Sequence, residues 1–258
     1  MAKNKGEIDE LLAKLYLIYW RDNNLNNIKT VGFKKLTTLE YFEYPKHTKS
    51  IEEISQLSDT ELETYCNSLD ISISPSIIKA DVIINNEAIS LKSKRGALPA
   101  LINHTHRKGI ENVCERISLD INPLDNAIND YWIKRIASDI NEDIKMNAQN
   151  NPFQAIKDST LIPLLSYFLF KGTAKADSSI SADFVYEFKD PSKFDTWIKL
   201  SPKEVAKSII DNTTISIRSK GIPSTYKHDN PIIERDISIK KWTRFFQGNH
   251  KGTLHIRG

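Results

Sequence analysis

The hydrophobic pattern of the first seventy residues predicts helices and a short pair of strands. Apolar residues at helical spacing indicate a helix from Lys5 to Arg21, and β-rich runs between Thr30 and Tyr44 indicate two strands. Ser50 with Glu53 and Ser58 with Glu61 each form a capping-box pattern, so a helix is expected to begin at each serine.

The segment 77–105 has the clearest strand pattern in the chain. Branched apolar residues lead to Asn85-Asn86, a pair that tolerates the left-handed backbone of a two-residue hairpin turn. With these two residues in the turn, Asp81 lies opposite Ser90. A basic, glycine-containing loop and the start of a helix are predicted to follow. Because side chains alternate along a strand, Val82, Ile84, Ile89 and Leu91 share one face, and Asp81, Ser90 and Lys92 share the other.

The sequence pattern in the middle of the chain predicts a long helix followed by a boundary between two lobes. Leu124–Met146 has apolar residues four apart, which is typical of a core-facing helix. The polar, breaker-rich segment Asn147–Pro152 follows, so we expect two lobes, 1–150 and 151–258, or one continuous domain. Later strands are predicted at Ala182–Lys189, Thr214–Ile217, Ile237–Ile239 and Thr253–Ile256. Together the pattern predicts an α/β protein with a mixed β-sheet flanked by helices and a strand-rich C-terminal lobe.

Composition narrows the class of protein without fixing its function. The 258 residues are 27% charged and 40% hydrophobic, which is typical of a globular protein. Cys66 and Cys114 are too few for a disulfide framework, and no signal-like or membrane-spanning segment is present, so a cytoplasmic protein is expected. The net charge is +3, but residues 201–258 hold eleven Lys and Arg against five Asp and Glu. A basic C-terminal segment suits a polyanion-binding face.

The polar face of the hairpin has the residue types that phosphodiester hydrolysis requires. This reaction needs a metal ion to activate water and a cation to stabilise the phosphate. Asp81 is a hard oxygen ligand suited to Mg²⁺, Lys92 supplies the cation, and Ser90 lies between them. The structural alternative is a cross-strand surface ion pair between Asp81 and Lys92, which contributes little to stability.

The hairpin resembles the core of PD-(D/E)XK nucleases, in which an Asp on one strand meets an acid-x-Lys on the next. The chain departs from this pattern at Ala80, where the Pro would stand, and at Ser90, where the acid would stand. Ser90-Leu-Lys-Ser, Gly96, Pro99 and Leu101-Ile-Asn103 are similar to the signature of HpaII-type restriction endonucleases, and Lys5-Gly6-Glu7 is similar to their opening Lys-Gly-Glu. The Lys-Ser-Lys-Arg-Gly run also resembles MspI-like enzymes, in which a neutral polar residue can replace the acid before the Lys.

This resemblance implies a restriction-endonuclease-like core and a type II restriction endonuclease of prokaryotic cytoplasm. Such an enzyme cuts duplex DNA at a short specific site with Mg²⁺, leaves 5′-phosphates, acts as a monomer or homodimer, and accompanies a cognate DNA methyltransferase. Asp81 would hold the metal, Lys92 would position the attacking water, Ser90 would occupy the third site position, and Glu7 would replace the missing carboxylate as a second metal ligand. A repair or structure-specific nuclease on the same core and a non-catalytic DNA-binding protein are the alternatives.

Candidate DNA-contacting residues follow the hairpin and recur near the C-terminus. Arg and Asn can contact base edges with two hydrogen bonds, whereas Lys mostly contacts phosphate. Two histidines at positions i and i+2 of a helix would face apart, so we interpret His104 and His106 as DNA contacts and not as metal ligands. Basic loops interleaved with Tyr226, Trp242, Phe245 and Phe246 suit a DNA-binding groove, but these aromatic residues are predicted to lie in the core. The candidates are Arg95, Asn103, His104, His106, Arg107, Lys171, Lys175, Arg218, Lys220, Ser224, Thr225 and Tyr226.

A rival catalytic site lies further along the chain. Asp177 followed by Glu187-Phe-Lys189 matches acid-x-Lys more closely as a sequence than the hairpin does. Asp190-Pro191 ends that strand at once, and no signature residues flank it. The rival therefore ranks second.

Overall fold

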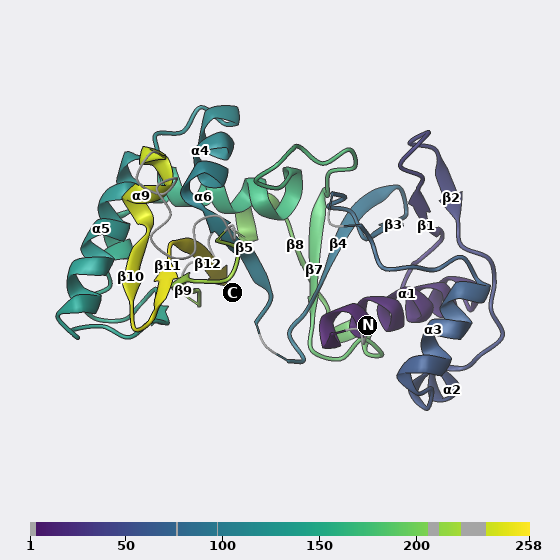
Figure 1. Ribbon diagram of the computed structural model, residues 1–258. Coiled ribbons are helices and arrows are strands. Elements are labelled where there is room, and N and C mark those ends of the chain that lie inside the picture. The colour runs from purple at the N-terminus through teal and green to yellow at the C-terminus, as the bar shows by residue number, and fades with distance from the viewer. Residues whose placement is uncertain (1–3, 76, 97, 206–211, 223–235) are drawn as a thin grey trace. The chain divides into compact units, whose positions relative to one another are not determined.

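The computed structural model describes residues 4–75, 77–96, 98–205, 212–222 and 236–258 (Figure 1). The chain forms two compact units, each built from more than one segment. Unit 1 comprises residues 1–99, 169–172 and 176–204, and unit 2 comprises residues 100–168, 173–175 and 205–258. This division differs from the predicted lobes 1–150 and 151–258, because the strand at 184–188 pairs with the hairpin of the first hundred residues. No helix among the described residues is long and apolar enough to cross a membrane.

Unit 1 is built on a mixed sheet flanked by helices (Figure 1). Six strands follow the order β2-β1-β3-β4-β7-β8, in which β4 and β7 run parallel and the other neighbours antiparallel. Its elements are α1 (Lys5–Asp22), β1 (Val31–Lys34), β2 (Tyr41–Glu43), α2 (Ile51–Ser55), α3 (Asp59–Ser68), β3 (Val82–Ile84), β4 (Glu87–Ser93), β7 (Phe184–Phe188), the short 3₁₀ helix η3 (Phe194–Thr196) and β8 (Ile198–Leu200).

Unit 2 combines an antiparallel sheet with helices and a separate hairpin. Four strands follow the order β5-β12-β9-β6, and β10 pairs with β11. Its elements are β5 (Ala100–His106), α4 (Arg107–Arg116), α5 (Asn122–Ile136), β6 (Ile144–Lys145), η1 (Pro152–Ala155), α6 (Asp158–Ser166), β9 (Thr214–Arg218), α9 (Ile237–Trp242), β10 (Arg244–Phe246), β11 (Asn249–Lys251) and β12 (Thr253–Arg257). A π-helical turn, η2 (Tyr167–Lys171), follows α6 and is shared between the two units.

The structure confirms the predicted register of the hairpin and the predicted face of the sheet on which its apolar side chains lie. Ile84 pairs with Glu87 and Val82 with Ile89, and Asn85 and Asn86 have φ angles of 50° and 69°. The four residues of the predicted apolar face, Val82, Ile84, Ile89 and Leu91, all lie in the core that α1 covers. Both capping boxes are confirmed as well, at Ser50 with Glu53 and at Ser58 with Glu61.

Three predicted elements are wrong. In each case the structure is determined by a strand pairing or a helix cap that the hydrophobic periodicity of the segment does not reveal. Ala100–His106 is a strand and not a helix, since it pairs with β12 near the end of the chain. The helix predicted over Leu124–Met146 ends at Ile136, because Ser138 adopts a φ of 65° and Asp139 N–H closes the last turn on the Lys134 carbonyl.

The third error concerns Ile237–Ile239, which begins a helix and not a strand. The Asp236 carboxylate accepts hydrogen bonds from the backbone N–H of Ser238 and Ile239 and so caps α9. The C-terminal strands at Thr214 and Thr253 are present as predicted.

The turn of the hairpin is held by one side chain. The Asn85 side-chain oxygen accepts hydrogen bonds from the N–H groups of Lys29 and Thr30, and its amide donates to the Asn27 carbonyl. We expect Asn85→Ala to lower the free energy of unfolding by about 1–2 kcal/mol in urea titrations, because these bonds and a residue tolerant of positive φ are lost. Asn86→Gly should leave stability equal or higher, since glycine accepts positive φ freely. Equal stability of the Asn85→Ala variant would contradict this role of the turn.

Candidate functional site

The polar face of the hairpin brings Asp81, Ser90 and Lys92 together as predicted from the register. Asp81 Oδ2 accepts hydrogen bonds from Ser90 Oγ at 3.2 Å and from the Leu91 N–H at 2.7 Å. Lys92 Nζ lies 3.8 Å from the same oxygen. The side chains of Asp81 and Lys92 are 12% and 26% exposed, and Ser90 is 1% exposed. The Asp81–Lys92 pair is therefore partly buried, and the Ser90 hydroxyl beside it is fully buried.

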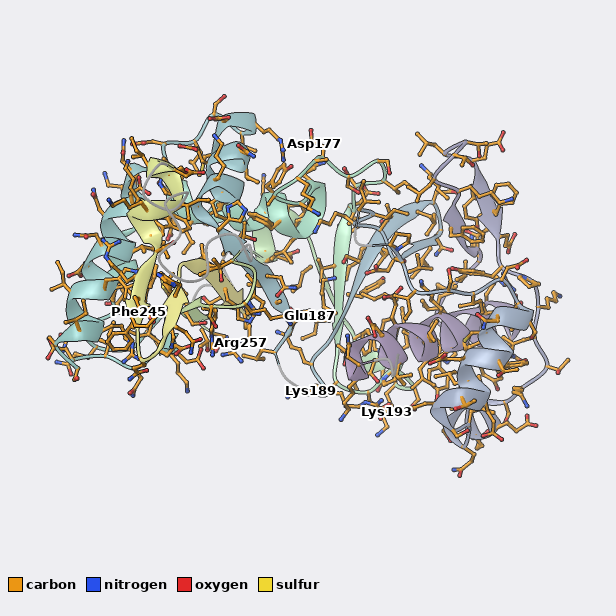
Figure 2. All side chains as sticks on the ribbon, in the orientation of Figure 1. Asp177, Glu187, Lys189, Lys193, Phe245 and Arg257 are labelled. Atoms are coloured by element: carbon orange, nitrogen blue, oxygen red, sulfur yellow. The ribbon has the colours of Figure 1, made fainter. Side chains whose placement is uncertain are left out.

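The rival acid Glu187 lies on the same face as Lys92. Parallel pairing of β4 with β7 sets Lys92 beside Glu187, and paired residues of adjacent strands point to the same side of the sheet. Glu187, on β7 in Figure 2, is 7% exposed, and Lys94 Nζ lies 2.7 Å from its carboxylate. Asp177 and Lys189, the other rival residues, are exposed. The structure thus combines the acid of the second predicted site with the lysine of the first.

Glu7 has a structural partner at the start of α1. Its carboxylate accepts a hydrogen bond from the Asn4 N–H at 2.8 Å, and Asn4 Oδ1 accepts one from the Glu7 N–H, which completes a capping box. The helix packs against the Ile89 and Leu91 face of the sheet, opposite to the face that carries Lys92. This arrangement gives Glu7 a helix-capping role and makes Glu187 the acid that shares the face of Lys92.

About two turns after Glu7, at Lys14, α1 approaches the segment that carries Asp81. Lys14 is 1% exposed, and its ammonium lies 2.6 Å from Glu10 and donates to Ser74 Oγ, which itself donates to the Asp81 carbonyl. Burial opposes the charge of Lys14, but Tyr44, Glu10 and Asp81 outweigh it and raise its pKa. Asp81 therefore lies in an environment that holds two lysines.

A third lysine near the trio was not identified from the sequence. Lys79 precedes Asp81 by two residues, and its backbone N–H donates to the Ile180 carbonyl and to Ser178 Oγ. Burial, together with the Lys92 cation, lowers the pKa of Lys79 to about 8, and the Asp81 carboxylate opposes the shift. A lysine with a strongly lowered pKa therefore borders the candidate site.

Asp81 also lines a pocket of about 220 Å³ at the edge of the same sheet. Lys14, Lys34 and Lys35 contribute cations to its lining, and Ser72 and Ser74 contribute hydroxyl groups. Among the residues that the structure describes, no group of three His, Cys, Asp or Glu side chains is placed to hold a metal ion.

Three of the predicted DNA-contacting residues have structural partners. Arg95 forms an ion pair with Asp9, which is fully buried and also accepts from Ser93. Arg107 is 4% exposed and is paired with Asp125 and Glu111. His106 caps α4, where its Nδ1 accepts a hydrogen bond from the Gly109 N–H, and burial lowers its pKa.

Other predicted contacts converge on the polar face of the unit 2 sheet. His104 stacks on His255 with ring centroids 4.2 Å apart, and burial, with Lys220, Arg218 and Arg257, lowers the pKa of His104. Burial, with His104 and the arginines, lowers the pKa of His255 to about 4. The stack is therefore uncharged at neutral pH in a surrounding of cations.

Acidic residues hold the arginines of this face. Arg218 is paired with Glu142 at 2.9 Å and with Asp143, and Arg257 reaches the same Asp143 at 3.0 Å. Any contact of these arginines with an anion would therefore share or replace an internal ion pair.

The remaining predicted contacts divide into exposed residues and residues outside the described part of the chain. Asn103, Lys171 and Lys175 are exposed, while Ser224, Thr225 and Tyr226 lie outside the described residues.

Comparisons with known proteins do not assign the chain to a family. No protein-family model, curated protein or solved structure matches it. A function for the chain therefore rests on its own residues and their arrangement.

The electrostatic effect of Asp81 and Lys92 on Lys79 can be tested by measuring the pKa of Lys79 in variants of the two residues. We expect Lys92→Ala to raise the pKa of Lys79 from about 8, because a neighbouring cation is removed, and Asp81→Asn to lower it, because a neighbouring anion is removed. NMR titration of isotopically dimethylated lysines in EDTA-containing buffer measures both shifts. Lys193→Ala, which removes an exposed lysine paired with Asp190, should leave the titration unchanged. Shifts of the same sign in the two site variants would contradict the arrangement.

Proposed function

We propose that the chain is a Mg²⁺-dependent nuclease that hydrolyses duplex DNA at a short specific site, as type II restriction endonucleases do. The observation that carries this proposal is the partly buried convergence of Asp81, Ser90 and Lys92 at β3 and β4. A carboxylate and an ammonium 3.8 Å apart, beside a pocket lined by further lysines, suit a phosphate whose negative charge increases during attack. The mixed α/β architecture is compatible with a restriction-endonuclease-like core.

The donor set fits the metal that this reaction requires. Mg²⁺ prefers oxygen ligands and is commonly held by one or two carboxylates together with waters and substrate phosphates. Asp81 would hold it, and the Ser90 hydroxyl would support the Asp81 carboxylate through the hydrogen bond already present. When bound, the metal ion lowers the pKa of water and neutralises phosphate charge.

The chain's own residues then supply position and charge. Lys92, tethered by its strand beside Asp81, would orient the attacking water and stabilise the phosphate oxygens. Glu187, on the other side of Lys92, would keep Lys94 in place and supply a second carboxylate to the same face. We therefore propose Glu187 in place of Glu7 as the acid that compensates for Ser90.

Unit 2 would supply the DNA-contacting surface through its histidine stack and cations. A cognate DNA methyltransferase is expected in the same system, because a restriction nuclease needs protection of its own genome. The second candidate function is a non-catalytic nucleic-acid-binding protein. It is favoured by the pairing of each nearby carboxylate with a lysine: Asp81 with Lys92, Glu187 with Lys94, and Glu10 with Lys14.

Incubation of plasmid DNA with the protein and Mg²⁺ separates these functions. Discrete fragments support a restriction enzyme. A smear or structure-dependent nicking supports a different nuclease, and intact plasmid supports the non-catalytic protein.

Lys92→Ala tests the catalytic lysine directly. We expect cleavage to fall by roughly 100-fold or more while DNA binding in Ca²⁺ persists, because the lost cation acts mainly on the reacting phosphate. Lys193→Ala is the matched control, since Lys193 is an exposed lysine of the same unit (Figure 2). Normal cleavage by Lys92→Ala would reject the hairpin as the site.

Paired acid variants identify the second carboxylate. We expect Glu187→Gln to reduce cleavage by at least about tenfold. Glu7→Gln keeps an acceptor for the Asn4 N–H and loses only a charge at the helix N-terminus, so it should cost about 0.3–1 kcal/mol of stability and leave the cleavage rate near wild type. Cleavage rates and urea titrations on both variants separate the two effects. Loss of cleavage in Glu7→Gln with normal stability would return the role to Glu7.

A further inference from the structure

α9 and the β10–β11 hairpin of unit 2 form an open pocket of about 520 Å³. Its lining includes Ile237, Lys240, Lys241, Arg244, Phe245 and His250. None of the residues considered for catalysis belongs to it.

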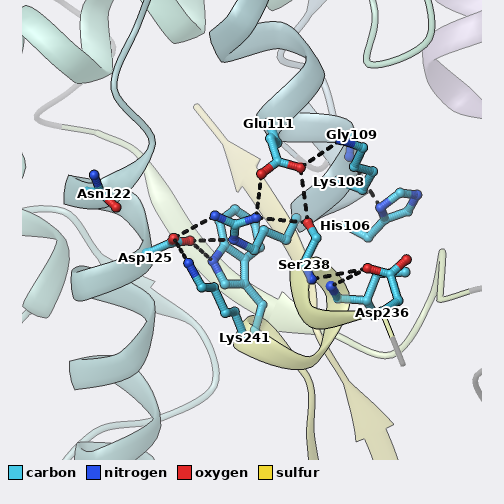
Figure 3. Close-up of polar contacts among 12 residues, drawn as sticks. His106, Lys108, Gly109, Glu111, Asn122, Asp125, Asp236, Ser238 and Lys241 are labelled. Carbon is cyan, nitrogen blue, oxygen red and sulfur yellow. Dashed lines mark hydrogen bonds and ion pairs between the residues drawn. The ribbon is translucent and has the colours of Figure 1, made fainter. Parts of the chain in front are cut away.

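The helix α9, which contributes to this pocket, is held by a polar network (Figure 3). Arg107 donates two hydrogen bonds of 2.7 Å to Asp125, and the same carboxylate accepts from the indole N–H of Trp242 at 2.7 Å. Trp242, the last residue of α9, is fully buried. The short helix is therefore fixed to α4 and α5, and the side chains that it presents at the pocket have a rigid support.

The hairpin that follows exposes an aromatic ring that was expected in the core. Strand alternation turns Phe246 inward, where its ring contacts Trp132, and turns Phe245 outward. Phe245 is 66% exposed, and its ring lies 5.1 Å from that of His250, its cross-strand partner. Ile237, on the pocket rim, is 71% exposed. Large apolar side chains grouped at the surface usually mark a binding site.

Several cationic side chains line the pocket. Lys240, Lys241 and Arg244 line the pocket, and among the described lining residues there is no carboxylate. Lys241 lies 3.3 Å from Asp125, but that acid is already paired with Arg107, so the second cation is not fully neutralised. Arg244 donates to the carbonyls of Lys240, Lys241 and Thr243, which holds its guanidinium at the end of α9.

We propose that this pocket binds an unpaired nucleotide, with its base stacked on Phe245 and its phosphates against Lys240, Lys241 and Arg244. A flat exposed ring among cations matches a ligand that has both π faces and negative charge, which is the composition of a nucleic-acid strand. A paired base presents only its edge in a groove, so stacking on Phe245 requires a base outside the duplex. The inference rests on the proposed function in taking DNA as the ligand and adds a contact to single-stranded or locally opened DNA.

Binding of a labelled oligothymidine of about twelve nucleotides, followed by fluorescence anisotropy in EDTA, tests the proposal. We expect Phe245→Ala to weaken the affinity for the single strand roughly tenfold and to change the affinity for a duplex of equal length less than about twofold. Phe245→Trp should restore single-strand binding. Ile136→Ala, which removes a 64% exposed apolar side chain from α5 of the same unit, should leave both affinities unchanged.

Equal affinity of Phe245→Ala and wild type for the single strand would overturn the proposal. An equal loss for strand and duplex would also overturn it, because Phe245 would then support the surface and not a base. Light scattering adds a third outcome: a dimer that Phe245→Ala converts to a monomer would assign the pocket to a contact between copies. Because the assay contains no metal, single-strand binding by a chain that cuts no DNA would retain this inference and reject the nuclease.

Discussion

The parallel pairing of β4 with β7 is the constraint on which the rest of the structure depends. Neighbouring antiparallel strands can be joined by a two-residue turn, as Asn85 and Asn86 join β3 to β4, but a parallel pair needs a long crossover. Between Ser93 and Phe184 the chain completes that crossover by forming much of unit 2. The same pairing sets Glu187 beside Lys92, so one hydrogen-bonding pattern determines both the division of the chain and the composition of the candidate site.

The candidate site also depends on the separation of the two faces of one sheet. Ile89 and Leu91 lie in the core beneath α1, while Ser90 and Lys92 point the other way. Partial burial strengthens the interaction of Asp81 with Lys92, because little water remains to screen the two charges. The desolvation that strengthens this interaction also lowers the pKa of Lys79, which shows that the face differs from an ordinary solvated surface.

Local features of the structure were predictable from the sequence, and features that depend on distant contacts were not. The Asn85-Asn86 turn, the two capping boxes and the Asp81–Ser90–Lys92 face follow from residues close together in the chain. The strand character of Ala100–His106 depends on its pairing with β12, and the position of Glu187 beside Lys92 depends on the pairing of β7 with β4. Both strands were predicted, but neither pairing leaves a local signal. Arg95 and Arg107 are of a residue type that often contacts DNA. In the structure their guanidinium groups form ion pairs with Asp9 and Asp125.

The interleaving of the two units limits how the protein can be dissected or recombined. The chain passes from one unit to the other at 99/100, 168/169, 172/173, 175/176 and 204/205, so a single cut at any of these boundaries separates strands from at least one sheet. A fragment that ends at residue 150 would keep β4 but lose β7, and the edge of β4 exposed in this way would invite aggregation. Exchange of unit 2 between related chains would have to transfer residues 100–168 and the C-terminal segment together. Changes in the function of unit 2 are therefore expected to arise by substitution within it more readily than by exchange of whole domains.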